Sequence, residues 1–260
     1  MSWRATAILA ALALSLLRTT LDSRSHSVLL AQARLHPESL AADPLVRAAE
    51  GAPYTQGPRR LAPVLAWLSH KGLPLETASA GLVLALWVLQ AGLMFRLARR
   101  ATGRDDAAFL ACCLFGLEMP LFPSAVPNGM TGLDRSLGIV PLLWGLGCLF
   151  SGDRWLAWAG LGAATYMHAN PAIHLWPLFA ASEAWSAFKD PASRRGALSR
   201  LAAAAVMGAP LLLSAGGDPF SEGAAEAARV SLIAFGPYIG GFGMTPTDYL
   251  FCIEGLLLLA

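Results

Sequence analysis

Charged residues are scarce in this sequence. Only 14% of its 260 residues are charged, whereas 55% are hydrophobic and the mean hydropathy is +0.52. Soluble domains carry roughly 25% charged residues. A water-soluble fold of this length could not bury so much apolar surface, so the composition predicts an integral membrane protein.

A strong net charge is also missing. The formal charge is +2, and the 19 Lys and Arg residues fall in short clusters between apolar runs. A nucleic-acid partner requires a continuous basic surface, which this pattern does not provide. We therefore expect membrane lipid, and no nucleic acid, as the partner.

Sequence motifs of soluble enzymes are absent as well. The chain has no GxxxxGK[ST], GxSxG or HExxH, and no GxGxxG after a strand. Its cysteines lie inside apolar runs, without CxxC spacing or nearby His, and we interpret them as small hydrophobic residues. They are Cys112, Cys113, Cys148 and Cys252. We assign no metal and no cofactor.

What the sequence does contain is a series of long apolar runs separated by arginine-bearing turns. The clearest run, 78–95, has no charge and is followed by Arg96, Arg99 and Arg100. About 20 apolar residues span a bilayer, and Lys and Arg mark its cytoplasmic side. Further runs lie at 5–17, 107–126, 137–150, 155–188, 201–213 and from 249 onward.

These runs predict an all-α polytopic bundle of about seven to eight spans. We expect a multi-pass protein of the bacterial inner membrane with a cytoplasmic N-terminus, and an uncleaved anchor at 5–17. The run 155–188 would form a helix about 51 Å long, against a hydrocarbon core of about 30 Å. Asn170 before Pro171 breaks it, because the residue ahead of proline avoids the α region and proline suits a first helical turn.

Two longer polar regions interrupt the runs. Residues 18–76 form the first extracytoplasmic loop, a folded cap in which 28–35 and 60–69 have the spacing of interfacial helices. Residues 214–248 form a second one, where the glycine-rich piece 230–244 is expected to be re-entrant. We interpret 1–260 as a single transmembrane domain and, because it stops within LLLLA, expect the natural protein to continue.

The predicted topology collects polar side chains on the extracytoplasmic face. An ionisable group at membrane depth costs about 2.5–3.5 kcal/mol, so Glu118 and His168 imply a hydrated cavity or a partner. A carboxylate there suits a general base, and Arg or His suits a lipid-linked phosphate. The candidate residues are Asp22, Asp43, Glu118, Asp134, Arg135, His168, Asn170 and His174.

Each candidate also has a purely structural interpretation. Asp22 and Asp43 are suited to cap helices. Asp134 and Arg135 fit a surface ion pair worth less than about 1 kcal/mol. His168 and His174 fit satisfied polar residues at a helix hairpin, at a spacing that is not a recognised metal site.

The order of parts resembles a known family. An anchor ending near Asp22, the outer loop SVLLAQARLHPESLAADPLVRA, the segment RLAPVLAWL and the stretch LDRSLGIVPLLWGLGCLFSGDRWLAWAGLGAATYMHANP resemble the GT-C fold of polytopic glycosyltransferases. The resemblance covers about residues 1–200. It implies a catalytic base in the first outer loop, best matched by Asp22 and next by Asp43, and a polyprenyl-phosphate-linked sugar donor.

The sequence therefore favours a membrane glycosyltransferase-like protein that works at the extracytoplasmic face. Asp22 or Asp43 would be the base, and the other candidates would hold phosphate and sugar. A transporter or lipid-handling protein that binds in the same cavity without reacting is an alternative. A non-catalytic membrane scaffold or truncated pseudo-enzyme is another.

Overall fold

The computed structural model describes residues 2–18, 25–40, 43, 46, 56–116, 133–168, 172 and 175–215. Every element assigned within these ranges is a helix, which confirms the all-α prediction. The helices are α1 (Trp3–Arg18), α2 (His26–Leu35), α3 (Pro37–Leu40), α5 (Gln56–His70), α6 (Leu75–Thr102), α7 (Asp105–Gly116), α8 (Leu133–Phe150), α9 (Arg154–Met167), α11 (Trp176–Lys189) and α12 (Arg194–Ala215).

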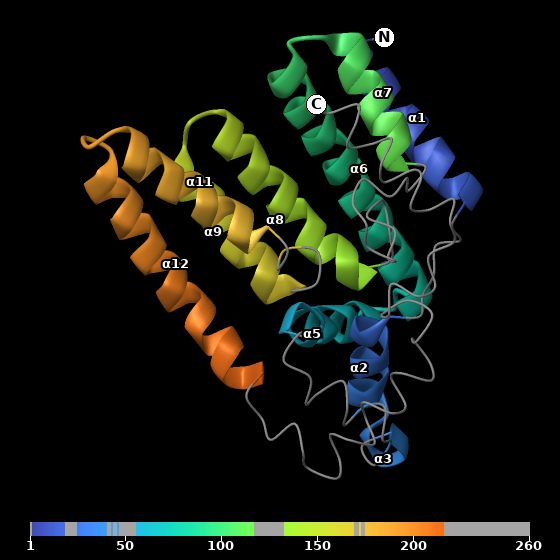
Figure 1. Ribbon diagram of the computed structural model, residues 1–260. Helices are drawn as coiled ribbons and strands as arrows, with labels where there is room; N and C mark the ends of the chain where they lie inside the picture. The colour runs from blue at the N-terminus through green and yellow to red at the C-terminus, as the bar shows by residue number, and fades with distance from the viewer. Residues whose placement is uncertain are drawn as a thin grey trace, which may run out of the picture.

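The long helices form a bundle with two different ends. The turns that join α6 to α7, α8 to α9 and α11 to α12 lie at the top of Figure 1, and we call this the turn end. At the opposite end α5 lies across the bundle, with α2 and α3 beyond it (Figure 1), and we call this the cap end. The arginine-bearing turns thus share one end, and the helices of the first polar region share the other.

Helix α8 joins two hydrophobic clusters. One cluster combines residues of α1, α2, α5, α6, α7 and α8 and includes Trp87, which is fully buried. The other combines α8, α9, α11 and α12. Its central Trp158 meets Trp176 and Phe179 with ring centroids 5.5 and 5.4 Å away. Because α8 contributes to both clusters, it fixes the two halves of the bundle relative to each other.

Glycines let α8 and α9 approach backbone to backbone. A Cβ on Gly160 would lie 2.5 Å from the Cα of Gly145, and a Cβ on Gly145 would lie 3.0 Å from the carbonyl oxygen of Ala157. Small residues permit close crossings of this kind in membrane proteins, where apolar side chains gain nothing by leaving lipid. The two helices therefore have no room for a side chain at this crossing.

Two helices in the described part of the chain, α6 and α8, are long and apolar enough to cross a membrane, and the apolar stretch Trp3–Leu16 is shorter. The expected run 78–95 lies inside α6. The predicted helices at 28–35 and 60–69 are confirmed as α2 and α5. The remaining spans of the predicted bundle stay a proposal, and the expected segments beyond residue 215 lie outside the described residues.

The start of α8 differs from the expectation. Helix α8 begins at Leu133 rather than 137, so Asp134 and Arg135 lie in its first turn and not in a loop. A carboxylate there is favoured by the partial positive charge of a helix N-terminus. The run 155–188 does break, since α9 ends at Met167 and α11 begins at Trp176 with Pro177 in its first turn. Asn170 and Pro171, where the break was expected, lie outside the described residues.

Candidate functional site

Asp134 of α8 connects the bundle to the first polar region. Its Oδ1 accepts hydrogen bonds from the Oγ of Ser27 at 2.5 Å and from the backbone N–H of Ser27 at 3.3 Å. Ser27 lies in the first turn of α2, whose N-cap Ser25 accepts from the N–H of Val28. The carboxylate therefore lies at a helix N-terminus, where unpaired N–H groups and the helix dipole favour an anion. Both Asp134 and Ser27 are buried, so this is not a surface ion pair.

His168 lies close to the same turn of α8. A Cβ on Gly138, four residues after Asp134, would stand 2.9 Å from the Cβ of His168 and 3.0 Å from its carbonyl oxygen. Residues four apart share one face of a helix. His168 is the C-cap of α9, with its N–H donating to the carbonyl of Ala164 at 2.8 Å. His168 therefore lies against α8 one turn after Asp134 and Arg135, at the cap end.

Helix α5 closes this region from the side of the first loop. A Cβ on Gly57 would overlap the carbonyl of Met167, the residue before His168, and Gly57 is buried. The start of α5 thus lies directly against the end of α9. We call Ser27, Gly57, Asp134, Arg135 and His168 the cap cluster. Its members come from four helices, two of them in the polar segment that was expected to form a folded cap.

The remaining candidates are Asp43 and four residues that the structure does not describe. Asp43 is half-buried and donates its N–H to the carbonyl of Leu40 at 3.0 Å, which places it beside the end of α3. Asp22, Glu118, Asn170 and His174 lie outside the described residues. In the sequence, Asp22 precedes Ser27 by five residues and Asn170 follows His168 by two.

Glu183 of α11 is a polar centre that the sequence analysis missed. Its side chain is 3% exposed and lies 3.2 Å from Nη1 of Arg154 on α9. Nε and Nη2 of Arg200 on α12 donate to its two carboxylate oxygens at 3.0 and 2.8 Å. The indole N–H of Trp158 donates to it at 3.4 Å. This ion cluster joins α9, α11 and α12.

Both carboxylate oxygens of Glu183 are engaged by charged donors, and the pairing with Arg200 is bidentate. Such a fork is a strong and geometrically specific form of ion pair. The cluster therefore has a structural role. A signal was present in the sequence: one isolated carboxylate in the run ASEAWSAF, flanked by helices that begin with arginine.

Metal ligands do not gather in the parts of the chain that the structure describes: no three His, Cys, Asp or Glu side chains come together there. The chemistry available at the cap cluster is that of a buried carboxylate, a guanidinium and an imidazole.

Comparison with protein-family models, curated proteins and solved structures gave no match to this chain.

Proposed function

We propose that this protein is a multi-pass membrane protein that transfers a sugar from a polyprenyl-phosphate-linked donor at the cap end, on the extracytoplasmic side. The membrane part of the proposal is supported by the outward faces of the helices. Large apolar side chains lie exposed there, for example Leu89 of α6 at 52%, Phe188 of α11 at 78% and Val206 of α12 at 74%. Soluble monomers seldom expose extensive apolar surface, whereas a lipid-facing bundle requires it.

The orientation is supported by the arrangement of charge. The turn end has Arg99, Arg104, Arg194 and Arg195 in or beside its short turns. Short loops rich in Lys and Arg stay on the cytoplasmic side. This orientation turns the cap cluster toward the extracytoplasmic side.

Single-cysteine labelling tests this topology. In a variant without the native cysteines, Ala101→Cys and Ala192→Cys probe two turns of the turn end, and Lys71→Cys probes the α5–α6 connection at the cap end; all three positions are exposed. A membrane-impermeant maleimide added to intact cells should label only Lys71→Cys. Labelling Ala101→Cys and Ala192→Cys from opposite sides would contradict the arrangement.

The cap cluster supports the transfer chemistry. A donor with a phosphate leaving group needs cationic or hydrogen-bonding groups to stabilise the developing charge, a role suited to Arg135 and His168. The acceptor hydroxyl needs a carboxylate to take its proton. Asp134 is occupied by Ser27, so its role is to hold α2 against α8. The base would then be Asp22, with Asp43 second, as the GT-C resemblance implies.

One observation carries this proposal: the first polar region folds onto the helix ends that bear Arg135 and His168. The packing of α2 on Asp134 and of α5 on Met167 brings these two helices of the first polar region close to Arg135 and His168. A catalytic base from the first loop and phosphate-binding groups from later helices require this juxtaposition.

Substitution of the acids tests the transfer. The protein in liposomes would be supplied with radiolabelled undecaprenyl-phosphate-linked hexoses and pentoses and with membrane acceptors. Asp22→Asn or Asp43→Asn should reduce transfer by about 100-fold or more, because general-base catalysis contributes about 10²–10⁴-fold. Asp106→Asn at the turn end is the charge-matched control for these two acid variants. Arg135→Gln should weaken donor binding. Full transfer in both acid variants would overturn the assignment.

A further inference from the structure

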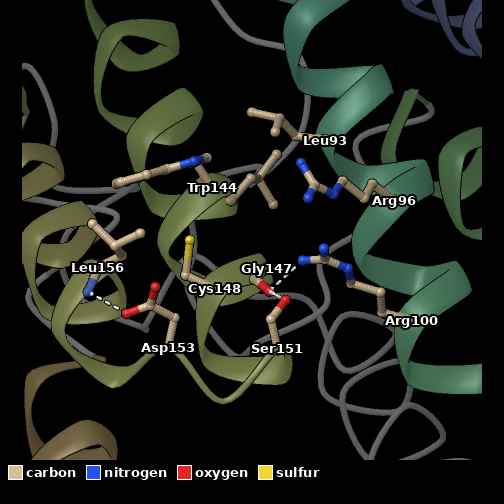
Figure 2. A pocket seen from close by; sticks show the side chains of 10 residues that line it. Leu93, Arg96, Arg100, Trp144, Gly147, Cys148, Ser151, Asp153 and Leu156 are labelled. Carbon is tan, nitrogen blue, oxygen red and sulfur yellow. Dashed lines mark hydrogen bonds between the residues drawn. The ribbon is translucent and has the colours of Figure 1, made fainter.

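A groove opens between α6 and α8 at the turn end, far from the cap cluster. Its volume is about 250 Å³. Figure 2 shows arginine side chains entering it from α6 and a tryptophan from α8. It is lined by Leu93, Arg96, Arg100, Leu143, Trp144, Gly147, Cys148, Ser151, Asp153 and Leu156.

The two arginines in the groove differ from their neighbours in how they are bonded. Arg99 pairs with Asp105 at 2.8 Å, and Arg104 pairs with Asp106. Arg96 is exposed and makes no hydrogen bond or ion pair within the described part of the chain. Its guanidinium is therefore free to bind an anion.

Arg100 is held in place on the same face of α6, four residues from Arg96. Its Nη1 donates to the carbonyl of Gly147 at 2.7 Å, and the Oγ of Ser151 donates to the same carbonyl at 2.8 Å. Figure 2 shows both bonds meeting at Gly147. This contact uses only one of the five N–H donors of the guanidinium. The remaining donors lie beside those of Arg96.

Asp153 is the one carboxylate that lines the groove. Its Oδ1 accepts from the N–H of Leu156 at 3.3 Å and so caps the start of α9. It enters from the α8–α9 turn, on the side of the groove opposite the α6 arginines (Figure 2). With two guanidiniums and one carboxylate, the lining carries a net charge of +1.

The remaining walls are apolar. Leu93 lies one turn before Arg96 on α6, and Trp144 lies one turn before Cys148 on α8, so both lead from the arginines toward the middle of the bundle. Trp144 is 37% exposed. The groove therefore carries charge near the turns and apolar surface deeper in the bundle. Its volume is smaller than the roughly 300–1,000 Å³ of sites that enclose a whole small ligand, which suits a headgroup whose chains lie outside.

We infer that Arg96 and Arg100 bind the phosphate group of an anionic membrane lipid, whose acyl chains follow the Leu93 and Trp144 walls. Basic pockets between membrane helices on the cytoplasmic side recognise such headgroups by the same combination of features. This inference rests on the membrane-spanning part of the proposed function and is independent of sugar transfer.

Lipid titration of the purified protein in neutral detergent tests the inference. The probes are phosphatidylglycerol, phosphatidylcholine and inorganic phosphate, with bound lipid counted by native mass spectrometry. We expect phosphatidylglycerol to bind best and Arg96→Gln to weaken it about fivefold, the effect of one arginine near a membrane surface. Arg96 has no partner in the described structure to lose, so this variant should unfold at the same temperature as the wild type.

Arg99→Gln is the matched control, because it removes the same charge from a residue that is next to Arg100 but does not line the groove. It should change phosphatidylglycerol binding by less than twofold. Equal loss in both variants would show general attraction and would overturn the site. If inorganic phosphate binds as tightly as phosphatidylglycerol, the inference that the bound phosphate belongs to a lipid is wrong. Either result leaves the cysteine-labelling test of topology unaffected, so the two failures are distinguishable.

Discussion

The two ends of the bundle each bury a carboxylate, and they satisfy it in different ways. At the turn end, Glu183 forms ion pairs with two guanidiniums, Arg154 of α9 and Arg200 of α12. At the cap end, Asp134 accepts from a serine hydroxyl and an amide 107 residues away. Ion pairs between neighbouring helices support the turn end, whereas at the cap end the carboxylate joins segments that are distant in the sequence.

The difference separates a structural centre from the centre that we propose to be functional. A buried ion cluster with every oxygen engaged holds helices together but has no capacity left for a substrate. The cap cluster, by contrast, gathers Arg135 and His168 beside an acid that already serves as an anchor. This contrast is the reason for proposing that the chemistry lies at the cap end, whereas the Glu183 cluster supports the bundle near the turn end.

Removing the charge of Glu183 should have the largest effect. Glu183→Gln leaves Arg200, whose side chain is 12% exposed, without its partner. Breaking one member of a buried ion pair costs about 3–5 kcal/mol. Thermal unfolding in detergent, followed by tryptophan fluorescence, should show a free energy of unfolding lowered by this amount, or no folded protein.

Two controls sharpen this prediction. Asp190→Asn removes an acid at the end of the same helix, where the carboxylate accepts from the exposed backbone N–H of Ala192, and should cost less than about 1 kcal/mol. The triple variant Glu183→Leu, Arg154→Leu, Arg200→Leu should recover most of the loss, because apolar packing replaces buried ion clusters well. An unstable triple variant would show that the charges themselves hold the three helices.

The crossing of α8 and α9 connects the two ends, and a side chain there should disturb both. Gly160→Ala would place a Cβ against backbone atoms of Gly145, and overpacking of this kind costs up to about 3 kcal/mol. Gly81→Ala on α6 is the control, because nothing lies within 4 Å of its Cβ position. It should raise stability by about 0.5–1 kcal/mol through helix propensity. Equal effects in the two variants would contradict the close crossing.

Loss of the serine anchor should affect the cap end alone. Ser27→Ala removes the 2.5 Å hydrogen bond to Asp134 and should cost about 1.5 kcal/mol, the lower range for bonds to charged groups. Ser39→Ala is the control, since its hydroxyl donates to an exposed carbonyl. Limited proteolysis should cut the first polar region faster in Ser27→Ala, with the α8–α9 pair unaffected. Equally faster proteolysis of the first polar region and of the α8–α9 pair would contradict a separate attachment of the cap end.

The features that the sequence predicted are local ones. Apolar periodicity located α2 and α5, because a helix is determined by neighbours three and four residues apart. The length of an uncharged run located the centre of α6. The break in 155–188 was predicted from proline chemistry, and the structure does interrupt this run between α9 and α11. Pro171 itself lies outside the described residues, so its part in the break stays a prediction.

The missing features depend on tertiary contacts. The pairing of Ser27 with Asp134 joins segments 107 residues apart, which no local pattern encodes. Glu183 was read as part of an apolar span, because its two arginine partners lie on other helices. Hydropathy shows that a carboxylate is unusual in a span, and only packing shows what it binds.

The smallest effect is expected from the exposed acid Asp106, beside the α6–α7 turn. Arg104 donates a hydrogen bond to it and lowers the pKa of the Asp106 carboxyl from 3.8 to about 2. Because the folded form holds the proton less tightly, this pair stabilises the fold above pH 3.8 and loses that effect as pH falls through about 2. The difference in unfolding temperature between wild type and Asp106→Asn should therefore be present at pH 6, shrink toward pH 2, and weaken in high salt because the pair is exposed. A difference in unfolding temperature that stays the same at pH 2 would contradict the ion pair. Loss of this difference at pH 2, together with a large effect of Glu183→Gln at pH 6, would separate the exposed charges of the turn end from its buried ones.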